Sequence, residues 1–152
     1  MNMSEAALIR TVQSYYDAVD SRDADRLSSL YLPGPSTALQ FNADPPIVTI
    51  DAIKNFSARL FQTVAGIKHS MIEIWTHPLK GDVVPMDLPP PRSSSTVTVV
   101  STALPTFSIR TASGMTNIAL PATSIFTIDK QMEKFLSVHN MFDIEKVYNA
   151  VR

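Results

Sequence analysis

The sequence contains no cysteine among its 152 residues, which excludes disulfides, thiolate metal sites and a cysteine nucleophile. It also lacks an excess of charge of either sign, since 13 basic residues stand against 14 acidic ones. A protein that binds nucleic acid mainly through phosphate contacts needs a basic excess. The charge balance therefore gives direct nucleic-acid binding no support.

Glycine is scarce, and the motifs that depend on it are missing. The 4 glycines are scattered, and neither a GxxxxGK[ST] nor a GxGxxG pattern occurs, so nucleotide binding is not expected. No GxSxG motif indicates a serine hydrolase. The histidines, His69, His77 and His139, have neither HExxH spacing nor cysteine neighbours. We therefore expect no metal site and no cofactor.

Long apolar segments of the membrane-spanning kind are missing as well. Charges near the start, such as Glu5 and Asp17, exclude the apolar core of a signal peptide, which predicts a cytosolic or nuclear protein. Segments 93–109 and 111–128 are uncharged apart from Arg110 between them, but their prolines and hydroxyl residues make them poor membrane spans.

Helical patterns come first along the chain, and strand patterns follow. Apolar residues at helical spacing predict helices over 4–20, 24–31 and about 51–65, with Ser4 and Asp23 as N-caps. Strands are predicted at 37–41, 47–50, 67–76, 95–109, 115–128 and 133–145. This order predicts an α+β fold, with three N-terminal helices on one face of an antiparallel sheet. We expect one domain over 1–152, with an exposed Pro/Ser-rich loop at about 78–95.

The segment from 93 to 128 carries a single charge, Arg110, in a texture of Thr, Val, Ser and Ile. A sheet with one solvated face normally alternates apolar with strongly polar residues. The helices can cover only one face, so the pattern predicts that a partner covers the other.

One enzyme-like set of residues stands out from the sequence. Tyr15 on the first helix, with His139 and Asp143 on the last strand, is a candidate catalytic set for a cavity between helices and sheet. The other interpretation is that Tyr15 belongs to the core and that His139 and Asp143 face outward, together with Met141, because strand side chains alternate.

Four segments in order resemble the nuclear transport factor 2-like (NTF2-like) superfamily. They are YYDAVDSRDADRLSSLY (15–31), TALQFN (37–42), KHSMIEIWTHP (68–78) and VHNMFDI (138–144). The resemblance implies a cone-shaped α+β fold with a strongly curved sheet. LQFNA (39–43), with Asn42, resembles in particular the small subunit of the fungal mRNA export receptor.

That closer resemblance implies a non-catalytic subunit at the nuclear pore, shared between nucleus and cytoplasm. It would pair through its sheet with the NTF2-like domain of a larger mRNA export receptor and help to bind nucleoporin FG repeats; a homodimer is also compatible. The partner-binding residues implied are Val100, Ile125, His139, Met141 and Asp143.

The superfamily's enzyme branch is the alternative. It resembles SnoaL-like polyketide cyclases, ketosteroid isomerase and limonene epoxide hydrolase, and it would use Tyr15, His139 and Asp143 as catalytic residues. The two carboxylates of the steroid enzyme fall near Phe41 and Thr123, which cannot ionise. The polarity of the cavity separates the classes: only Phe, Leu and Tyr would favour a binding module, and an Asp143 carboxylate inside would favour catalysis.

Overall fold

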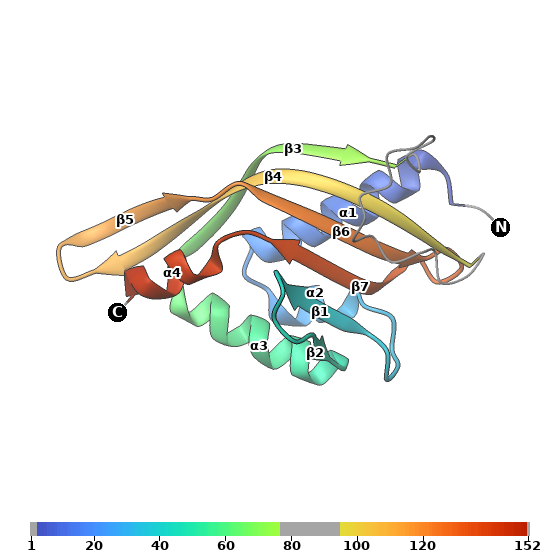
Figure 1. The fold of residues 1–152 in the computed structure, drawn as a ribbon, viewed down its shortest axis with the longest axis horizontal. Helices are drawn as coiled ribbons and strands as arrows, with labels where there is room; N and C mark the ends of the chain where they lie inside the picture. The colour runs from blue at the N-terminus through green and yellow to red at the C-terminus, as the bar shows by residue number, and fades with distance from the viewer. Residues whose placement is uncertain (1–2, 77–94, 152) are drawn as a thin grey trace.

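The computed structural model describes residues 3–76 and 95–151, which form one sheet with helices packed on it (Figure 1). The elements are α1 (Glu5–Asp20), α2 (Ala24–Ser29), β1 (Ala38–Phe41), β2 (Ile47–Val48), α3 (Ile50–Thr63), β3 (Gly66–Trp75), β4 (Thr96–Thr111), β5 (Gly114–Ala119), β6 (Ala122–Asp129), β7 (Lys134–Met141) and α4 (Ile144–Val151). Except for Ser95, the Pro/Ser-rich loop predicted at about 78–95 lies outside the described residues.

Side-chain caps start the N-terminal helices. The side chains of Ser4 and Asp23 accept hydrogen bonds from backbone N–H groups in the first turns of α1 and α2, as predicted. The third helix, predicted to begin at about residue 51, begins at Ile50 and is capped by Thr49. Gly66, just past the predicted end of that helix, is the first residue of β3.

The sheet has the strand order β2-β1-β7-β6-β4-β3, with β5 paired to β4. Most pairs are antiparallel, but β1 runs parallel to β7, with Leu39 opposite Val138. The prediction of a wholly antiparallel sheet is therefore wrong at this pair. Strands this far apart in the chain are paired by tertiary packing, which carries no local signal.

The strand predicted at 115–128 is two strands, because β4 changes partner along its length. Ala103 pairs with Ala122 on β6, whereas Thr106 pairs with Ala119 on β5. The change falls at Pro105, which has no N–H to give to a ladder. A backbone hydrogen bond of 3.0 Å from Leu120 N–H to the Pro105 carbonyl holds the junction.

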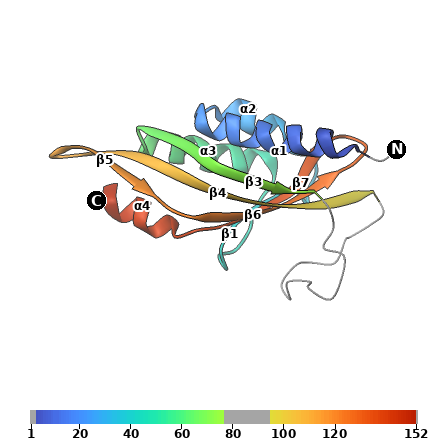
Figure 2. The same cartoon turned by 90° about the horizontal axis from the view of Figure 1, so that it is seen from above.

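Helices α1, α2 and α3 lie on the same side of the curved, unclosed sheet, which confirms the predicted α+β architecture (Figure 2). A fourth helix was not predicted. The last strand, expected to reach residue 145, ends at Met141, and α4 follows and packs against β4. Its apolar residues Ile144 and Val147 are buried, three positions apart, which is helical rather than strand spacing.

The two faces of the sheet differ in burial as the alternation of side chains requires. Along β4, Val99 and Ser101 face the helices and are fully buried, while Val100 between them is half-buried. The pairing register sets Val100 beside Ile125, and Ile125 beside His139. These three predicted partner-binding residues thus form one row on the face away from α1–α3, and their role in pairing remains a prediction.

Met141 lies on the same outer face, opposite Thr123 in the register of β6 and β7. Asp143, in contrast, lies beyond the end of β7. The prediction that it shares a strand face with Met141 is therefore wrong. Its carboxylate is exposed and lies 3.5 Å from Lys146 Nζ on α4.

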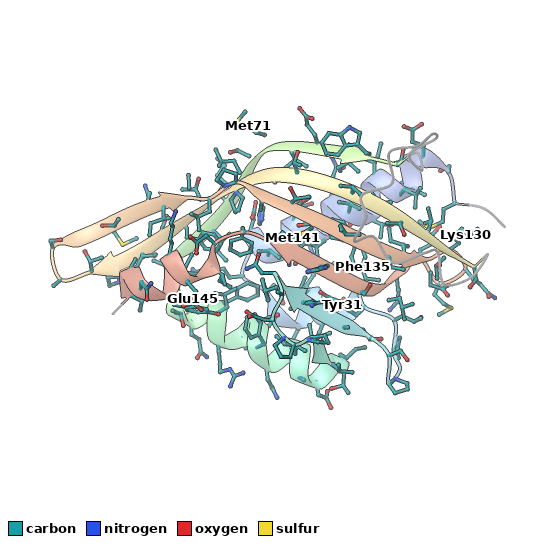
Figure 3. All side chains as sticks on the ribbon, in the orientation of Figure 1. Tyr31, Met71, Lys130, Phe135, Met141 and Glu145 are labelled. Carbon is teal, nitrogen blue, oxygen red and sulfur yellow. The ribbon has the colours of Figure 1, made fainter. Side chains whose placement is uncertain are left out.

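The core between α1 and the sheet is rich in aromatic rings. Tyr15, Phe126 and Phe135 contact one another edge to face or tilted, with ring centroids 5.2 to 5.8 Å apart. Tyr31 and Phe135, both labelled in Figure 3, also meet, with ring centroids 6.0 Å apart. The Tyr31 hydroxyl is fully buried and has no hydrogen-bond partner within the described part of the chain.

Candidate functional site

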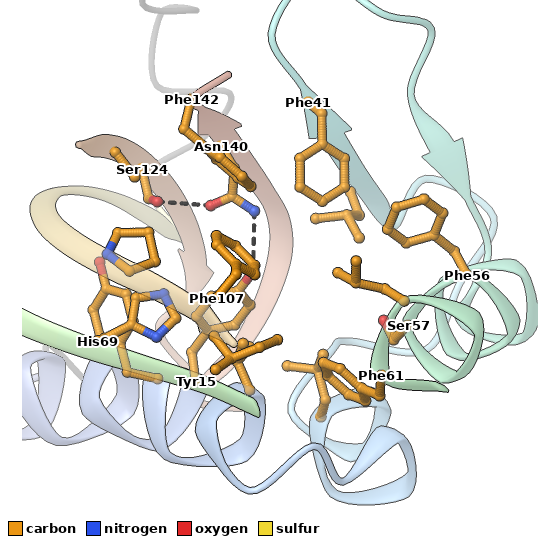
Figure 4. Close-up of a pocket in the computed structure, with 18 residues that line it drawn as sticks. Tyr15, Phe41, Phe56, Ser57, Phe61, His69, Phe107, Ser124, Asn140 and Phe142 are labelled. Atoms are coloured by element: carbon orange, nitrogen blue, oxygen red, sulfur yellow. Dashed lines mark hydrogen bonds between the residues drawn. The ribbon is translucent and has the colours of Figure 1, made fainter. Parts of the chain in front are cut away.

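A cavity of about 50 Å³ lies between α1, α3 and the helix-facing side of the sheet (Figure 4). This is several times the roughly 10–15 Å³ that one water molecule requires. Its wall is mainly apolar and includes five phenylalanines, Phe41, Phe56, Phe61, Phe107 and Phe142. None of its lining residues among those described is Lys, Arg, Asp or Glu, so its polarity comes from hydroxyl, amide and imidazole groups.

His69 is the ionisable side chain of greatest chemical interest in this wall. It faces inward from the edge strand β3, and its side chain is 10% exposed. Asp20, the last residue of α1, accepts hydrogen bonds from the His69 backbone N–H at 3.0 and 3.1 Å. The same carboxylate lies 2.5 Å from His69 Nδ1. Because a carboxylate only accepts, Nδ1 carries the proton, and Nε2 of the neutral ring keeps a free lone pair.

Tyr16 supports the His69 ring from α1. The two ring centroids are 4.7 Å apart. The Tyr16 hydroxyl donates to Ser101 Oγ at 2.7 Å, and Ser101 donates to the backbone carbonyl of Glu73 at 2.7 Å. Burial raises the pKa of Tyr16, so its hydroxyl stays neutral. These hydrogen bonds hold the Tyr16 side chain against strands β3 and β4.

A second polar group in the wall is formed by Tyr15, Asn140 and Ser124. Ser124 Oγ donates to Asn140 Oδ1 at 2.6 Å, and Asn140 Nδ2 donates to the Tyr15 hydroxyl at 3.0 Å (Figure 4). Burial is the largest effect on Tyr15 and raises the pKa of its hydroxyl well above the ordinary value. Tyr15 is therefore a neutral hydrogen-bond donor in this cavity.

The catalytic set proposed from sequence does not come together. Tyr15 lines the cavity, but His139 and Asp143 do not. His139 is on the outer face of the sheet, where its Nε2 lies 2.6 Å from the backbone oxygen of Asn42. Asp143 is exposed at the start of α4. The cavity is therefore neither lined only by Phe, Leu and Tyr nor entered by an Asp143 carboxylate. The histidine in its wall is His69.

Sequence reasoning missed His69, Asp20, Ser124 and Asn140. A signal for His69 was present, because it alternates with buried Ile67 and therefore faces inward on the predicted strand. Asp20 also lies four residues after Tyr16, on the same side of α1. From the sequence, His69 was considered only as a possible metal ligand. Within 3–76 and 95–151, no three His, Asp or Glu side chains gather in a way that would hold a metal ion.

Among the helices in these ranges, none is long and apolar enough to cross a membrane.

Several solved structures share the fold over nearly their whole length. A candidate SnoaL-like polyketide cyclase from Shewanella denitrificans OS-217 has a TM-score of 0.68 at 13% identity, covering 95% of this chain and 96% of that one. Another, from Shewanella putrefaciens CN-32, has a TM-score of 0.68 at 14% identity, covering 98% and 97%. A ketosteroid isomerase-like protein from Erwinia carotovora atroseptica SCRI1043 has a TM-score of 0.66 at 17% identity, covering 93% and 98%. At these identities the likeness shows the fold alone.

The predicted role as a non-catalytic subunit in mRNA export is wrong. Solved structures that share the fold include candidate polyketide cyclases and ketosteroid isomerase-like proteins, which agree better with the alternative. These comparisons give no support to a close relation with the fungal export subunit. They also give none to a role in nuclear transport or a place at the nuclear pore. The resemblance that suggested export rested on Asn42, whose side chain in the structure has a local role, bonding the backbone of Phe142.

At the level of sequence, no curated protein matches the chain. The model of one protein family does match, over residues 8–108, which is more than half of the chain. Since the fold and this match agree, the chain belongs to the nuclear transport factor 2 (NTF2) domain family.

Proposed function

We propose that this protein is a small-cavity enzyme of the SnoaL-like kind, which moves a proton on the carbon next to a carbonyl group of a small substrate. The observation that carries the proposal is the Asp20–His69 pair at the wall of an apolar cavity that Tyr15 also lines. The likeness in fold to candidate polyketide cyclases and ketosteroid isomerase-like proteins supports the same class.

His69 is the proposed base. With Nδ1–H directed to Asp20, the lone pair of Nε2 is the ring's free acceptor. It takes the proton from the carbon next to the carbonyl, and the C–H electron pair forms the C=C bond of an enolate. Asp20 holds the ring and stabilises the imidazolium that results. The imidazolium then returns the proton to a carbon of the enolate.

Tyr15 is the proposed electrophile. As the enolate forms, the electron pair of the carbonyl double bond moves to its oxygen, which then carries the negative charge. A neutral O–H in a dry site stabilises this charge strongly because no solvent reorganisation is needed. The raised pKa of Tyr15 keeps its hydroxyl protonated for this role.

Deuterium exchange tests the proposal. We expect the wild-type protein to exchange the methyl protons of acetophenone with D2O faster than buffer does, followed by proton NMR. His69→Gln should slow the exchange by about 100-fold or more, the usual contribution of a general base. Tyr15→Phe should slow it by about 100-fold as well, as expected for the loss of one oxyanion donor.

His139→Gln is the matched control, because that histidine lies on the outer face of the sheet and not in the cavity. Its exchange rate should equal that of the wild type, measured at a temperature where both are folded. Exchange at the buffer rate in the wild type, or equal losses in His69→Gln and His139→Gln, would refute the proposal.

A further inference from the structure

A chain of three buried side chains runs across the cavity wall in one direction. The side chain of Ser124 donates to Asn140 Oδ1, and Asn140 Nδ2 donates to Tyr15. All three residues are at most 6% exposed. An amide oxygen only accepts hydrogen bonds and an amide NH2 only donates them, so Asn140 gives the chain a single polarity.

Because Tyr15 already accepts from Asn140, its own O–H proton is left to point elsewhere. Within residues 3–76 and 95–151, no group accepts a hydrogen bond from it. A buried donor without an acceptor is costly, and a ligand atom that accepts would remove this cost. Tyr15 therefore presents a directed donor to whatever enters the cavity.

The rest of the wall restricts the ligand's charge and shape. With no Lys, Arg, Asp or Glu among its described lining residues, the cavity has no counterion for a charged group. Moving an unpaired charge from water into such a site is strongly unfavourable. Phe107 and Phe142 are close to parallel, with an angle of 18° between rings 5.8 Å apart, and Phe41 meets Phe142 edge to face. Flat apolar ligands fit such surroundings.

We propose that Ser124 and Asn140 fix Tyr15 as a hydrogen-bond donor, so that the cavity selects uncharged, flat ligands whose polar group accepts a hydrogen bond. Ser124 and Asn140 are positioning residues in this scheme, since they act through Tyr15. The inference rests on the proposed function only for the assignment of the cavity as the ligand site.

Benzonitrile and phenylacetylene test the proposal as a pair. They have nearly the same size and shape, but the nitrile nitrogen accepts a hydrogen bond, whereas the terminal alkyne is a weak C–H donor. Neither has a proton next to a carbonyl, so both report binding without proton transfer. We expect the wild type to bind benzonitrile about fivefold more tightly, the value of one ordinary hydrogen bond. The infrared band of the bound nitrile should shift, and Tyr15→Phe should abolish the shift and the preference.

Asn140→Asp tests the direction of these hydrogen bonds, because the aspartate side chain has almost the same shape as that of asparagine. A carboxylate only accepts, so it would draw the Tyr15 proton toward itself and leave the ligand without a donor. The preference for benzonitrile should then disappear or reverse. Ser124→Ala, a smaller change, should weaken the preference less and serves if Asn140→Asp does not fold.

Three results would overturn the proposal. They are no binding of either probe to the wild type, equal binding of both without a nitrile shift, and a preference that survives Tyr15→Phe. If the probes discriminate as expected but acetophenone exchange is absent, the proposed function fails while this inference stands. If exchange depends on His69 but the probes bind equally, the inference fails alone.

Discussion

Asn42 and Phe142, 100 positions apart in the chain, are joined by two hydrogen bonds. Asn42 Nδ2 donates to the Phe142 carbonyl at 2.8 Å, and the Phe142 backbone N–H donates to Asn42 Oδ1 at 3.1 Å. Asn42 also has a positive φ of 51°, a region that asparagine tolerates better than most residues. Its side chain thus ties the end of β1 to the end of β7.

Replacing Asn42 should therefore destabilise the fold in a graded way. Asn42→Ala loses both side-chain bonds and strains the backbone, which should cost about 2–4 kcal/mol in the free energy of unfolding. Asn42→Gly loses the bonds but relieves the strain, so it should cost about 1 kcal/mol less than alanine. Urea denaturation measures both values. Equal losses for the two variants would show that the backbone conformation carries no strain.

Tyr31→Phe should stabilise the protein. The Tyr31 hydroxyl is buried without a partner, and removing an unsatisfied buried polar group should raise the free energy of unfolding by about 1 kcal/mol at neutral pH. Urea denaturation of the variant beside the wild type measures the difference. Tyr148→Phe is a useful comparison, since Tyr148 is only partly buried and should change little.

Alkaline pH should widen this difference. Burial raises the pKa of Tyr31 well above its ordinary value. From about pH 10 upward the unfolded state then releases the Tyr31 proton while the folded state retains it, so stability falls as the pH rises. Tyr31→Phe removes this part of the loss of stability. Tyr15 and Tyr16, whose pKa values are also raised by burial, still contribute their parts in the variant. Stability curves that remain parallel between about pH 8 and about pH 11 would contradict the assignment.

Asp20→Ala should change the tautomer of His69. In the wild type the carboxylate holds the proton on Nδ1, whereas the variant should shift it toward Nε2. Nitrogen-15 NMR of the imidazole distinguishes the two forms. Asp17→Ala is the matched control, because Asp17 is exposed on the same helix and should leave the tautomer unchanged. A wild-type ring protonated on Nε2 would be the contrary result.

The expectation that a partner sheet covers the outer face can be tested at Met141, which lies on that face. If a second copy packs there, Met141→Glu would bury an unpaired carboxylate and should weaken self-association at least about 10-fold. Sedimentation velocity over a range of concentrations measures this. Thr98→Glu, on the outer face of β4 but near the start of the strand, should have a smaller effect. If the wild-type protein is monomeric at every concentration, the expectation that a second copy covers the outer face is wrong.

Most of the order of helices and strands, and the alternation of buried and exposed side chains along a strand, follow from local patterns and were predictable. Ser4 and Asp23 cap helices through contacts within three residues. Alternation along β4 separates buried Val99 from half-buried Val100. Tyr15, for which the sequence left open a place in the core or at a cavity, is buried and lines the cavity, because its place in the apolar stripe of α1 directs it to the sheet. The helical spacing of Ile144 and Val147 was equally local, and was missed.

The sequence by itself determined the α+β class, the helical layer and the apolar walls, since these depend on spacings of two to four residues. Only the tertiary structure decided the site. Asp20 and His69 are 49 positions apart, and Tyr15 and Asn140 are 125 apart, so their hydrogen bonds exist only once α1 has packed on the sheet. The parallel pairing of β1 with β7 has the same origin. Contacts between distant segments depend on which surfaces bury one another, and periodicity within a segment does not record that choice.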